Sequence, residues 1–459
     1  MLIGWCGRSR LFKTRVKTLN YLQSLNILLI NQFYPPDIAP TGVKLHDLAK
    51  YLVSIGHRVT VLSSRGSYNG NKNFKSEILD DINVIRLKAS NLGRATHLGK
   101  LLDYLSFFLI LLVKLLVLKP RPDIVVALTT PPYLGLVPVA AFGIWHKKDR
   151  GQNELLNSNA RKRIKIVHWT MDLYPDVINA HGILQKENII YRLLGFINRK
   201  IFIHSDAILA LGPSMLDRIG AYLEKPLEKI PLAASKANIC LGREKNVRGG
   251  LDLEWVPLWG DTDLENLTEI EALDIRSKYG WKADTVVLMH AGNIGLGVGL
   301  DEFMKAADHL GKEGPVWAFF GGGKRWSKVM QFKQAHKDAR IELYEYAPKS
   351  ILGAADVHLV SLVSSWTGVG VPSKLQNIFS IGKPVIFVGS MESEMALWIM
   401  ESGGGWVVKE GDVDGLLSAI EEAKNSNERI RRGQAAREYA KKYFNQKKNC
   451  ELIANIITN

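Results

Sequence analysis

Short apolar runs, separated by longer segments with a helical spacing of apolar residues, recur along the first half of the chain. The first run, Leu25–Gln32, is followed by a proline-rich loop and by a segment that predicts a helix from Gly42 to Ile55. The next run, Arg58–Ser63, has the spacing of a parallel strand joined to the first through that helix. The same alternation predicts strands at Asn83–Leu87, Ile124–Ala127, Ile164–Thr170 and Ala207–Ala210.

A second alternating series begins near residue 284. We therefore expect an α/β fold of two domains, residues 25–260 and 284–459, joined by a linker at 261–283. Ligands of open parallel sheets bind outside the carboxyl ends of the strands, so two such domains place a ligand in the cleft between them. The strands expected in the second series are Thr285–His290, Val316–Phe320, Ile341–Leu343, Val357–Val360, Pro384–Val388 and Trp406–Val408.

Residues 101–118 form the strongest apolar run of the chain. From Tyr104 onward this run makes a helix of roughly 22 Å, short of the ~30 Å hydrocarbon core of a bilayer. Lys114 also interrupts the run, so the pattern disfavours a transmembrane helix. Two interpretations stay open. The helix is buried in the protein, or it lies in the membrane interface with Lys114, Lys119 and Arg121 near anionic headgroups.

Basic residues outnumber acidic ones by 60 to 45, which gives a net charge of +15. Such a surplus predicts an anionic partner, for example a phosphorylated substrate or an anionic lipid surface. No basic run is interleaved with aromatic residues, so we expect no nucleic acid partner. Residues 1–24 form a basic N-terminal extension without the apolar segment of a secretory signal. Three widely spaced cysteines fit a reducing cytosol.

The turn Pro372-Ser-Lys374 is the best candidate for anion binding, because the sequence places it at the start of a helix. Free backbone N–H groups at such a terminus favour anions, and Lys374 adds a point charge suited to phosphate. A glycine loop, Gly292–Gly299, follows the first strand of the second half and allows close backbone approach to a diphosphate. A second run, Phe320–Arg325, either lines the same pocket through Gly323 or is an ordinary turn.

Polar residues also follow the predicted strands of the first half, at the edge where a cleft would lie. Asp172, within Met171–Asp176, is the acid best placed to meet a substrate hydroxyl, although structural aspartates are common at such turns. Thr41 and Gly42 begin a helix that faces the same edge. The sequence shows no Ser-His-Asp arrangement, P-loop or metal-binding cluster.

Together, these motifs resemble family-4 glycosyltransferases, which have the GT-B fold of two Rossmann-like domains facing across a cleft. The similarity is greatest to bacterial transferases of O-antigen, capsule and exopolysaccharide biosynthesis. From Leu25 onward the matching segments cover nearly the whole chain and keep their order. They are Asn31–Gly42, Gly56–Leu62, Thr129–Pro132, Met171–Asp176, Gly292–Gly295, Ala354–His358, Val371–Lys374, Gly382–Val385 and Gly404–Val408.

The resemblance implies a retaining transfer of a hexosyl or N-acetylhexosaminyl group from a nucleotide sugar, in particular a UDP-sugar, to a lipid-linked or saccharide acceptor. The donor would bind the second domain, and the acceptor the first domain and its membrane-facing surface. No metal or other cofactor is implied. The protein would be cytoplasmic and associate peripherally with the inner face of the membrane, and its C-terminal helix would cross back to the first domain.

Residue by residue, the resemblance assigns the donor diphosphate to Lys374, Ser373 and the glycine loop. It assigns the orientation or deprotonation of the acceptor to Asp172. The catalytic candidates are therefore Asp172 and Lys374. The donor-binding candidates are Gly292, Asn293, Ile294, Gly295, Gly323, Ser373, Lys374, Asn377 and Glu394, and the acceptor-side candidates are Thr41, Gly42 and Asp172.

Several positions depart from the family pattern, among them Met171, which stands where relatives often have a His before the Asp of the acceptor motif. Val369 and Asn377 stand where many relatives have a pair of glutamates, and Asn293 and Val298 stand where they have Arg and Lys. Two alternatives therefore accompany the transferase. One is a nucleotide-sugar epimerase of similar fold, which would need an acidic pair and a basic cluster around the cleft. The other is a non-catalytic scaffold that binds a nucleotide sugar within a polysaccharide assembly complex.

Overall fold

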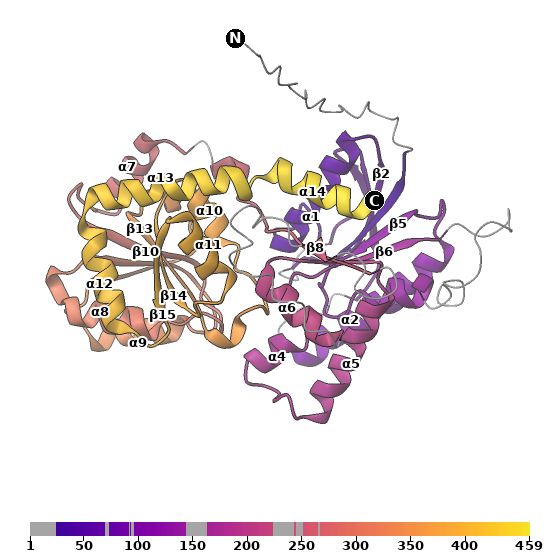
Figure 1. The fold of residues 1–459 in the computed structure, drawn as a ribbon, viewed down its shortest axis with the longest axis horizontal. Coiled ribbons are helices and arrows are strands. Elements are labelled where there is room, and N and C mark those ends of the chain that lie inside the picture. The colour runs from indigo at the N-terminus through magenta and orange to yellow at the C-terminus, as the bar shows by residue number, and fades with distance from the viewer. Residues whose placement is uncertain are drawn as a thin grey trace, which may run out of the picture.

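The computed structural model describes residues 24–459 apart from 69–72, 91, 93–95, 144–162, 224–242, 245–250 and 265–266. These residues form two sheets with helices packed on their faces, and the two units lie side by side along the long axis of the molecule (Figure 1). The α/β architecture with two parallel-sheet domains is therefore confirmed. The predicted basic extension, 1–24, lies outside the described residues except for its last position.

The first sheet has the strand order β3-β4-β2-β1-β5-β6-β7-β9-β8. Its strands are parallel except that β3 and β8 pair antiparallel with their neighbours. The central strands are short apolar runs buried on both faces, as expected of a parallel sheet covered by helices. The strands are β1 (Asn26–Ile30), β2 (Arg58–Ser64), β3 (Glu77–Leu79), β4 (Ile82–Leu87), β5 (Ile124–Ala127), β6 (Lys165–Trp169), β7 (Ala207–Ala210), β8 (Arg243–Glu244) and β9 (Asp252–Trp255).

The second sheet is parallel throughout, with the order β12-β11-β10-β13-β14-β15. Adjacent carboxyl ends bring the segments after β10 and β13 to one edge of the sheet, where the glycine loop and the Lys374 turn both lie. The strands are β10 (Val287–Asn293), β11 (Val316–Gly322), β12 (Ile341–Tyr344), β13 (Val357–Leu362), β14 (Val385–Gly389) and β15 (Gly405–Lys409).

Helices cover both sheets and bury apolar side chains against them. In the first unit they are α1 (Pro40–Ser54), α2 (His97–Val117), α3 (Leu136–Pro138), the π-helical turn η1 (Val139–Gly143), α4 (Asp176–Ala180), α5 (Ile189–His204) and α6 (Pro213–Tyr222). In the second they are α7 (Glu269–Lys278), α8 (Asp301–Leu310), α9 (Trp326–Ala335), α10 (Lys374–Ser380), α11 (Glu394–Ser402) and α12 (Val413–Lys424), with short 3-10 turns η4 (Thr262–Leu264), η5 (Gly311–Glu313), η6 (Lys349–Ala354) and η7 (Ser364–Trp366).

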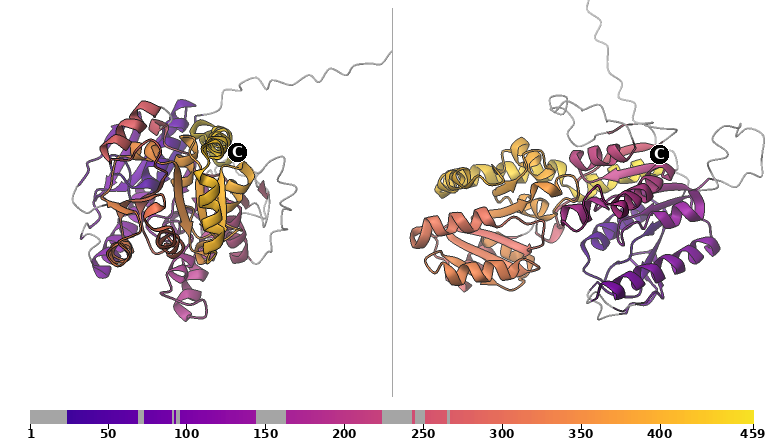
Figure 2. Two further views of the ribbon diagram at one scale, coloured as in Figure 1. Left: turned by 90° about the vertical axis from the view of Figure 1, so that its left-hand side faces the viewer. Right: turned by 90° about the horizontal axis from the view of Figure 1, so that it is seen from below.

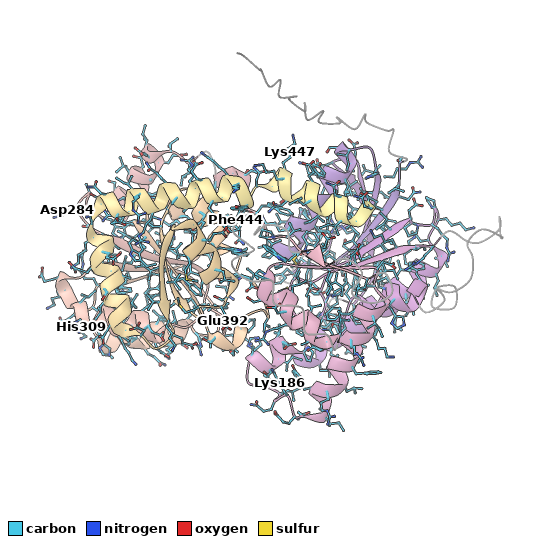
Figure 3. All side chains as sticks on the ribbon, viewed as in Figure 1. Lys186, Asp284, His309, Glu392, Phe444 and Lys447 are labelled. Carbon is cyan, nitrogen blue, oxygen red and sulfur yellow. The ribbon has the colours of Figure 1, made fainter. Side chains whose placement is uncertain are left out.

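The last two helices, α13 (Ser426–Tyr443) and α14 (Gln446–Thr458), run from the second unit back to the first (Figure 1). Figure 3 labels Phe444 and Lys447 where one helix passes into the other. The second helix buries Cys450, Ile453 and Ile457 in the core of the first unit. The predicted return of the C-terminal helix is therefore confirmed.

Helix α2 contains the strongest apolar run but is not buried all round. Phe107, Leu111 and Leu115, spaced by four residues, lie on its inner stripe in the core. Leu109 on the outer face keeps 66% of its surface exposed. The interpretation of α2 as a fully buried helix is therefore wrong. No helix in the described part of the chain has the length and apolar character needed to cross a membrane.

Helix α7 lies inside the range 261–283 that the sequence assigned to a linker. Its Arg276 guanidinium is buried and donates to the Asp356 carboxylate at 2.9 Å and to the Ala354 carbonyl at 3.0 Å, so α7 packs on the second unit. The pattern did not predict this helix because most of its residues are polar or exposed and no continuous apolar stripe marks it.

Candidate functional site

Lys374 begins helix α10 and reaches the glycine loop at the carboxyl end of β10. Its Nζ lies 2.9 Å from Nε2 of His290, and a Cβ placed on Gly292 would lie 3.0 Å from its Cε. In the described part of the chain Lys374 has no carboxylate partner within ion-pair distance. Burial lowers the pKa of its ammonium group to about 8. The structure thus brings Lys374 and Gly292 together, with a half-buried cation beside partly buried main chain.

The two glycine runs of the second unit pack on each other. Gly292 and Gly321 are partners in the β10–β11 register, and a Cβ on Gly321 would overlap the Gly292 carbonyl oxygen. A Cβ on Gly323 would likewise overlap the Asn293 side chain. Gly323 therefore has a packing reason to be glycine, because it supports the loop that begins at Gly292.

Ile294 and Ser373 contribute differently from the sequence assignment. The Ile294 side chain is buried in the core, its N–H donates to the Gly322 carbonyl at 2.7 Å, and its carbonyl accepts from the Arg325 N–H at 3.1 Å. Both its main-chain groups thus have partners within the protein, and its assignment to the donor site stays a prediction. Ser373 is the N-cap of α10 without a side-chain cap bond, and it stays partly exposed beside Lys374.

Asp172 meets the second unit directly. It forms an isolated antiparallel bridge with Gly370, and the N–H of Leu173 donates to the Val369 carbonyl at 2.8 Å. A Cβ on Gly370 would lie 2.9 Å from the Asp172 carboxylate, so glycine is what admits this approach. Burial raises the pKa of Asp172 to about 6. The bridge places an acid of unusual pKa beside Gly370, which lies four residues before Lys374 in the chain.

The acceptor-side candidates Thr41 and Gly42 lie at the first turn of α1, by the end of β1. Thr41 Oγ1 accepts a hydrogen bond from the Asn31 amide at 3.2 Å. A Cβ on Gly42 would lie 2.7 Å from the Phe33 carbonyl oxygen, so this glycine allows the helix to pack on the preceding loop. Both residues thus shape the carboxyl edge of the first sheet, as Asp172 does.

Asn377 lies about one turn beyond Lys374 on α10. Its Oδ1 accepts from the Asp261 N–H at 2.8 Å, and its Nδ2 donates to the Asp261 carboxylate at 2.9 Å. The same carboxylate pairs with Lys44 at 3.0 Å and with Lys349 at 2.6 Å. The structure therefore places Asn377 in a cluster that joins the two units, and its assignment as a ribose or sugar ligand stays a prediction.

Glu394 is also used between the units. Its Oε1 accepts from the Met215 N–H at 2.8 Å, so a carboxylate of the second unit caps the first turn of α6 in the first. A Cβ on Gly212 would overlap the Glu394 side chain, and burial raises the pKa of that carboxyl. Figure 3 labels the neighbouring Glu392 at the boundary of the two units. Glu394 thus contacts α6 in this structure, and its assignment to the donor pocket stays a prediction.

Three further residues at the boundary were not found from the sequence. His290 precedes the glycine loop and was not singled out. Asp261 lies in the supposed linker, and Arg218 on α6 donates to the Thr367 carbonyl at 2.5 Å and to Asp176 at 3.2 Å. Of these three residues, only His290 could have been found from the sequence. It is a polar residue on a buried strand just before the glycine loop, so it lies near the carboxyl edge of the second sheet.

No protein-family model matches the chain. It is 25% identical over 268 residues to a Pseudomonas aeruginosa protein described as glycosyltransferase WbjE, covering 57% of this chain and 59% of the relative. It is 26% identical over 173 residues to an Escherichia coli K12 protein described as colanic acid biosynthesis glycosyl transferase WcaI, covering 36% of this chain and 42% of the relative. The matched regions thus span less than two thirds of either relative.

Solved structures resemble almost the whole chain. Sucrose-phosphate synthase from Thermosynechococcus elongatus has a TM-score of 0.67 at 14% identity, covering 94% of this chain and 98% of that one. WaaG, a glycosyltransferase of lipopolysaccharide biosynthesis, has a TM-score of 0.61 at 17% identity, covering 94% and 100%. Anabaena HepE, solved with UDP, has a TM-score of 0.61 at 13% identity, covering 95% and 100%. The chain therefore has the GT-B fold.

Proposed function

We propose that this protein is a retaining glycosyltransferase that moves a hexosyl or N-acetylhexosaminyl group from a UDP-sugar to a lipid-linked or saccharide acceptor in cell-surface polysaccharide synthesis. One observation carries the proposal. Lys374, a half-buried cation without a carboxylate partner among the described residues, lies against Gly292 at the edge where the two units meet. The names of the two relatives and the UDP bound to HepE support the same reaction class.

The leaving group of such a transfer is a nucleoside diphosphate, whose charge grows as the glycosidic bond breaks. Lys374 would stabilise that charge, because a cation fixed in a partly desolvated site acts more strongly than one in water. The Gly292 loop would let the main chain approach the same phosphates. The charge that relatives place at positions 293 and 298 is absent here, so Lys374 would carry more of this task.

Asp172 would act on the acceptor. Its pKa of about 6 leaves the carboxylate ionised at neutral pH yet basic enough to accept or orient a hydroxyl proton. Thr129 holds this residue in place, since its Oγ1 accepts from the main-chain N–H groups of Met171 and Asp172 at 3.1 Å each. We assign no nucleophile to the retaining step.

The proposed acceptor also requires a surface that meets a membrane, and the outer faces of α2, α3 and α5 offer one. Helix α3 packs between α2 and α5, and all three carry exposed apolar residues on the outside. We call this the α2/α5 surface. It consists of Leu98, Leu101, Leu102, Leu105, Leu109, Val113, Leu116, Val117, Leu136, Ile189, Ile190, Leu193 and Phe196.

The charges on α2 and α5 suit an anionic bilayer. The two helices contain Lys100, Lys114, Arg192, Arg199 and Lys200, and their one acid, Asp103, is buried and accepts from Ser90 and Leu92. In Figure 1 the helices α2, α4 and α5 lie on the side of the first unit away from α14. Apolar residues with a basic border are the composition of interfacial membrane helices.

The transferase is tested with purified protein, UDP- and GDP-sugars, and membrane extract that contains lipid-linked acceptors. We expect one donor to raise the melting temperature and to lose its sugar only when the extract is added, with the anomeric configuration kept. Donor turnover without acceptor would favour the epimerase. Donor binding without any product in the extract would favour the scaffold, and absence of binding by every donor would refute the proposal.

Membrane binding is tested with Leu109→Glu, which puts a charge in the middle of the α2/α5 surface. Leu109 is exposed, so the fold should persist while co-flotation with phosphatidylglycerol vesicles falls about tenfold or more. Leu273→Glu on α7, an exposed leucine of the second unit, is the matched control and should float normally. Equal flotation of both variants would remove the membrane from the proposal.

A further inference from the structure

His290 lies on β10 just before the glycine loop, and only 1% of its surface is exposed. Its two ring nitrogens have different partners. Nδ1 is 3.2 Å from the Leu359 carbonyl on β13, and Nε2 is 2.9 Å from the Lys374 ammonium. A carbonyl oxygen only accepts hydrogen bonds, so Nδ1 carries the proton and donates. Nε2 is then the lone-pair nitrogen and accepts from Lys374.

We propose that His290 is a positioning residue that holds the Lys374 ammonium over the Gly292 main chain, ready for an anionic phosphate ligand. The sheet supplies the geometry. β10 and β13 are neighbours, so the Leu359 carbonyl fixes the ring of His290, and the ring in turn fixes the end of the longest side chain on α10. One of the three N–H donors of Lys374 is used in this way and two remain.

Gly292 completes the arrangement from the other side. Its φ of +118° is a conformation that favours glycine, and a Cβ there would press on Lys374 Cε. The end of the lysine side chain therefore lies close to both an imidazole nitrogen and the Gly292 main chain. Since a free lysine side chain loses considerable rotamer freedom on binding a phosphate, a residue that fixes it beforehand removes that cost from the binding step.

Burial and the neighbouring positive charge keep the imidazole of His290 neutral. Burial first, then the positive charge of Lys374, holds the pKa of His290 well below its ordinary value, with a smaller effect from His358. His358 is itself held neutral, since burial lowers its pKa to about 3, and beyond it lies Lys383. No carboxylate is among the groups that shift the pKa of His290. A neutral imidazole accepts from Lys374 throughout the physiological range.

A purely space-filling histidine makes different predictions. The ring also packs near Phe319, with centroids 6.2 Å apart, so an apolar residue of similar size would satisfy a packing role. A positioning role requires an acceptor instead. His290→Leu and His290→Gln form the matched pair, because both remove the ring and only glutamine retains an acceptor for Lys374 and a donor for the Leu359 carbonyl.

The first measurement is the pKa of Lys374, from the pH dependence of its acetylation by trace acetic anhydride, read by mass spectrometry. A hydrogen bond from the ammonium group favours its charged form, so losing the acceptor lowers the pKa. We expect the pKa of Lys374 to fall below about 8 in His290→Leu and to stay near the wild-type value in His290→Gln. An unchanged pKa in both variants would overturn the proposal.

The second measurement rests on the proposed function and uses UDP binding by calorimetry. We expect His290→Leu to weaken binding about tenfold in the wild-type background and less than about twofold when Lys374→Met is already present. Equal losses in both backgrounds would show a structural role and refute positioning. If wild-type protein binds no UDP, the proposed function fails, while the acetylation experiment still decides the His290–Lys374 contact.

Discussion

Two lysines at the domain boundary have opposite surroundings. Lys44, on α1, is 6% exposed and pairs with the Asp261 carboxylate at 3.0 Å. Lys374, on α10, meets a neutral imidazole at 2.9 Å and has no carboxylate within reach in the described structure. Asn377, one turn after Lys374, belongs to the Lys44 cluster. Helix α10 therefore contributes a residue to the surroundings of each lysine. The two surroundings differ in the Asp261 carboxylate, which pairs with Lys44 and not with Lys374.

The Asp261 carboxylate determines which of the two lysines lacks an internal counter-charge and can pair with an anionic ligand. Burial by itself would raise the pKa of Asp261, but Lys44 and Lys349 outweigh it and lower that pKa to about 2. Both lysines of this cluster thus have a carboxylate partner within the protein. At Lys374 burial lowers the pKa to about 8 without an internal counter-charge. A desolvated cation of this kind gains most from an incoming anion, whereas the Lys44 cluster holds the two units together.

The largest expected effect is the difference between Lys374→Met and Lys44→Met in transfer activity and in stability. Lys374→Met should cut transfer by about a hundredfold or more, as removal of a charge-stabilising donor does, without lowering the melting temperature. Lys44→Met should leave Asp261 with Lys349 alone and destabilise the protein by ~1–3 kcal/mol, with local nucleotide binding preserved. The measurements are kcat/KM, UDP affinity and thermal unfolding. Interchanged outcomes would reverse our assignment of the two clusters.

The next effect concerns pH. If Asp172 acts ionised and Lys374 acts protonated, kcat/KM should rise with pH through about 6 and fall through about 8. Lys374→Arg should remove the fall at high pH, because a guanidinium stays charged there. Asp172→Asn should remove the rise at low pH along with most activity. A profile that is flat from pH 5 to 9 would contradict both roles.

A smaller effect is expected in the acid stability of the Lys44 cluster. The pKa of Asp261 is lowered from 3.8 to about 2 in the folded state, so its stabilising contribution is complete above pH 4. It should be lost as pH falls from 3.8 towards 2. Urea unfolding of wild type and Asp261→Asn should therefore differ most above pH 4 and converge near pH 2. A constant difference across this window would show that the charge of Asp261 is not what stabilises.

The smallest effect tests Asn377 itself. Asn377→Ala removes two hydrogen bonds to Asp261 and should cost ~1–2 kcal/mol of unfolding free energy while the KM for the donor sugar stays within about twofold. Ser380→Ala, later on the same helix, serves as the control. A raised KM with unchanged stability would support a role of Asn377 in donor binding. It would also show that Asn377 acts with Lys374 and not only with Asp261.

Much of the site followed from local sequence. The turn of Lys374 and the loop of Gly292 were predicted to lie together, and they do, because each follows a strand and β10 and β13 are neighbours with parallel direction. The same reasoning placed Asp172 at the facing edge. Helix α7 escaped prediction because it lacks an apolar stripe. Two interpretations of α2 stayed open because an apolar run does not reveal how many faces of its helix find partners.

The order of apolar runs and turns was sufficient for two parallel sheets and for the strand ends that carry glycines, Lys374 and Asp172, because these depend on spacing along the chain. The partners of Asp261, Asn377 and Glu394 depend on how the two units approach each other (Figure 2). Those contacts join residues more than a hundred positions apart in the chain, and no local periodicity encodes them. Packing across the boundary therefore determined which polar residues pair with each other. It left Lys374 without a carboxylate partner among the described residues.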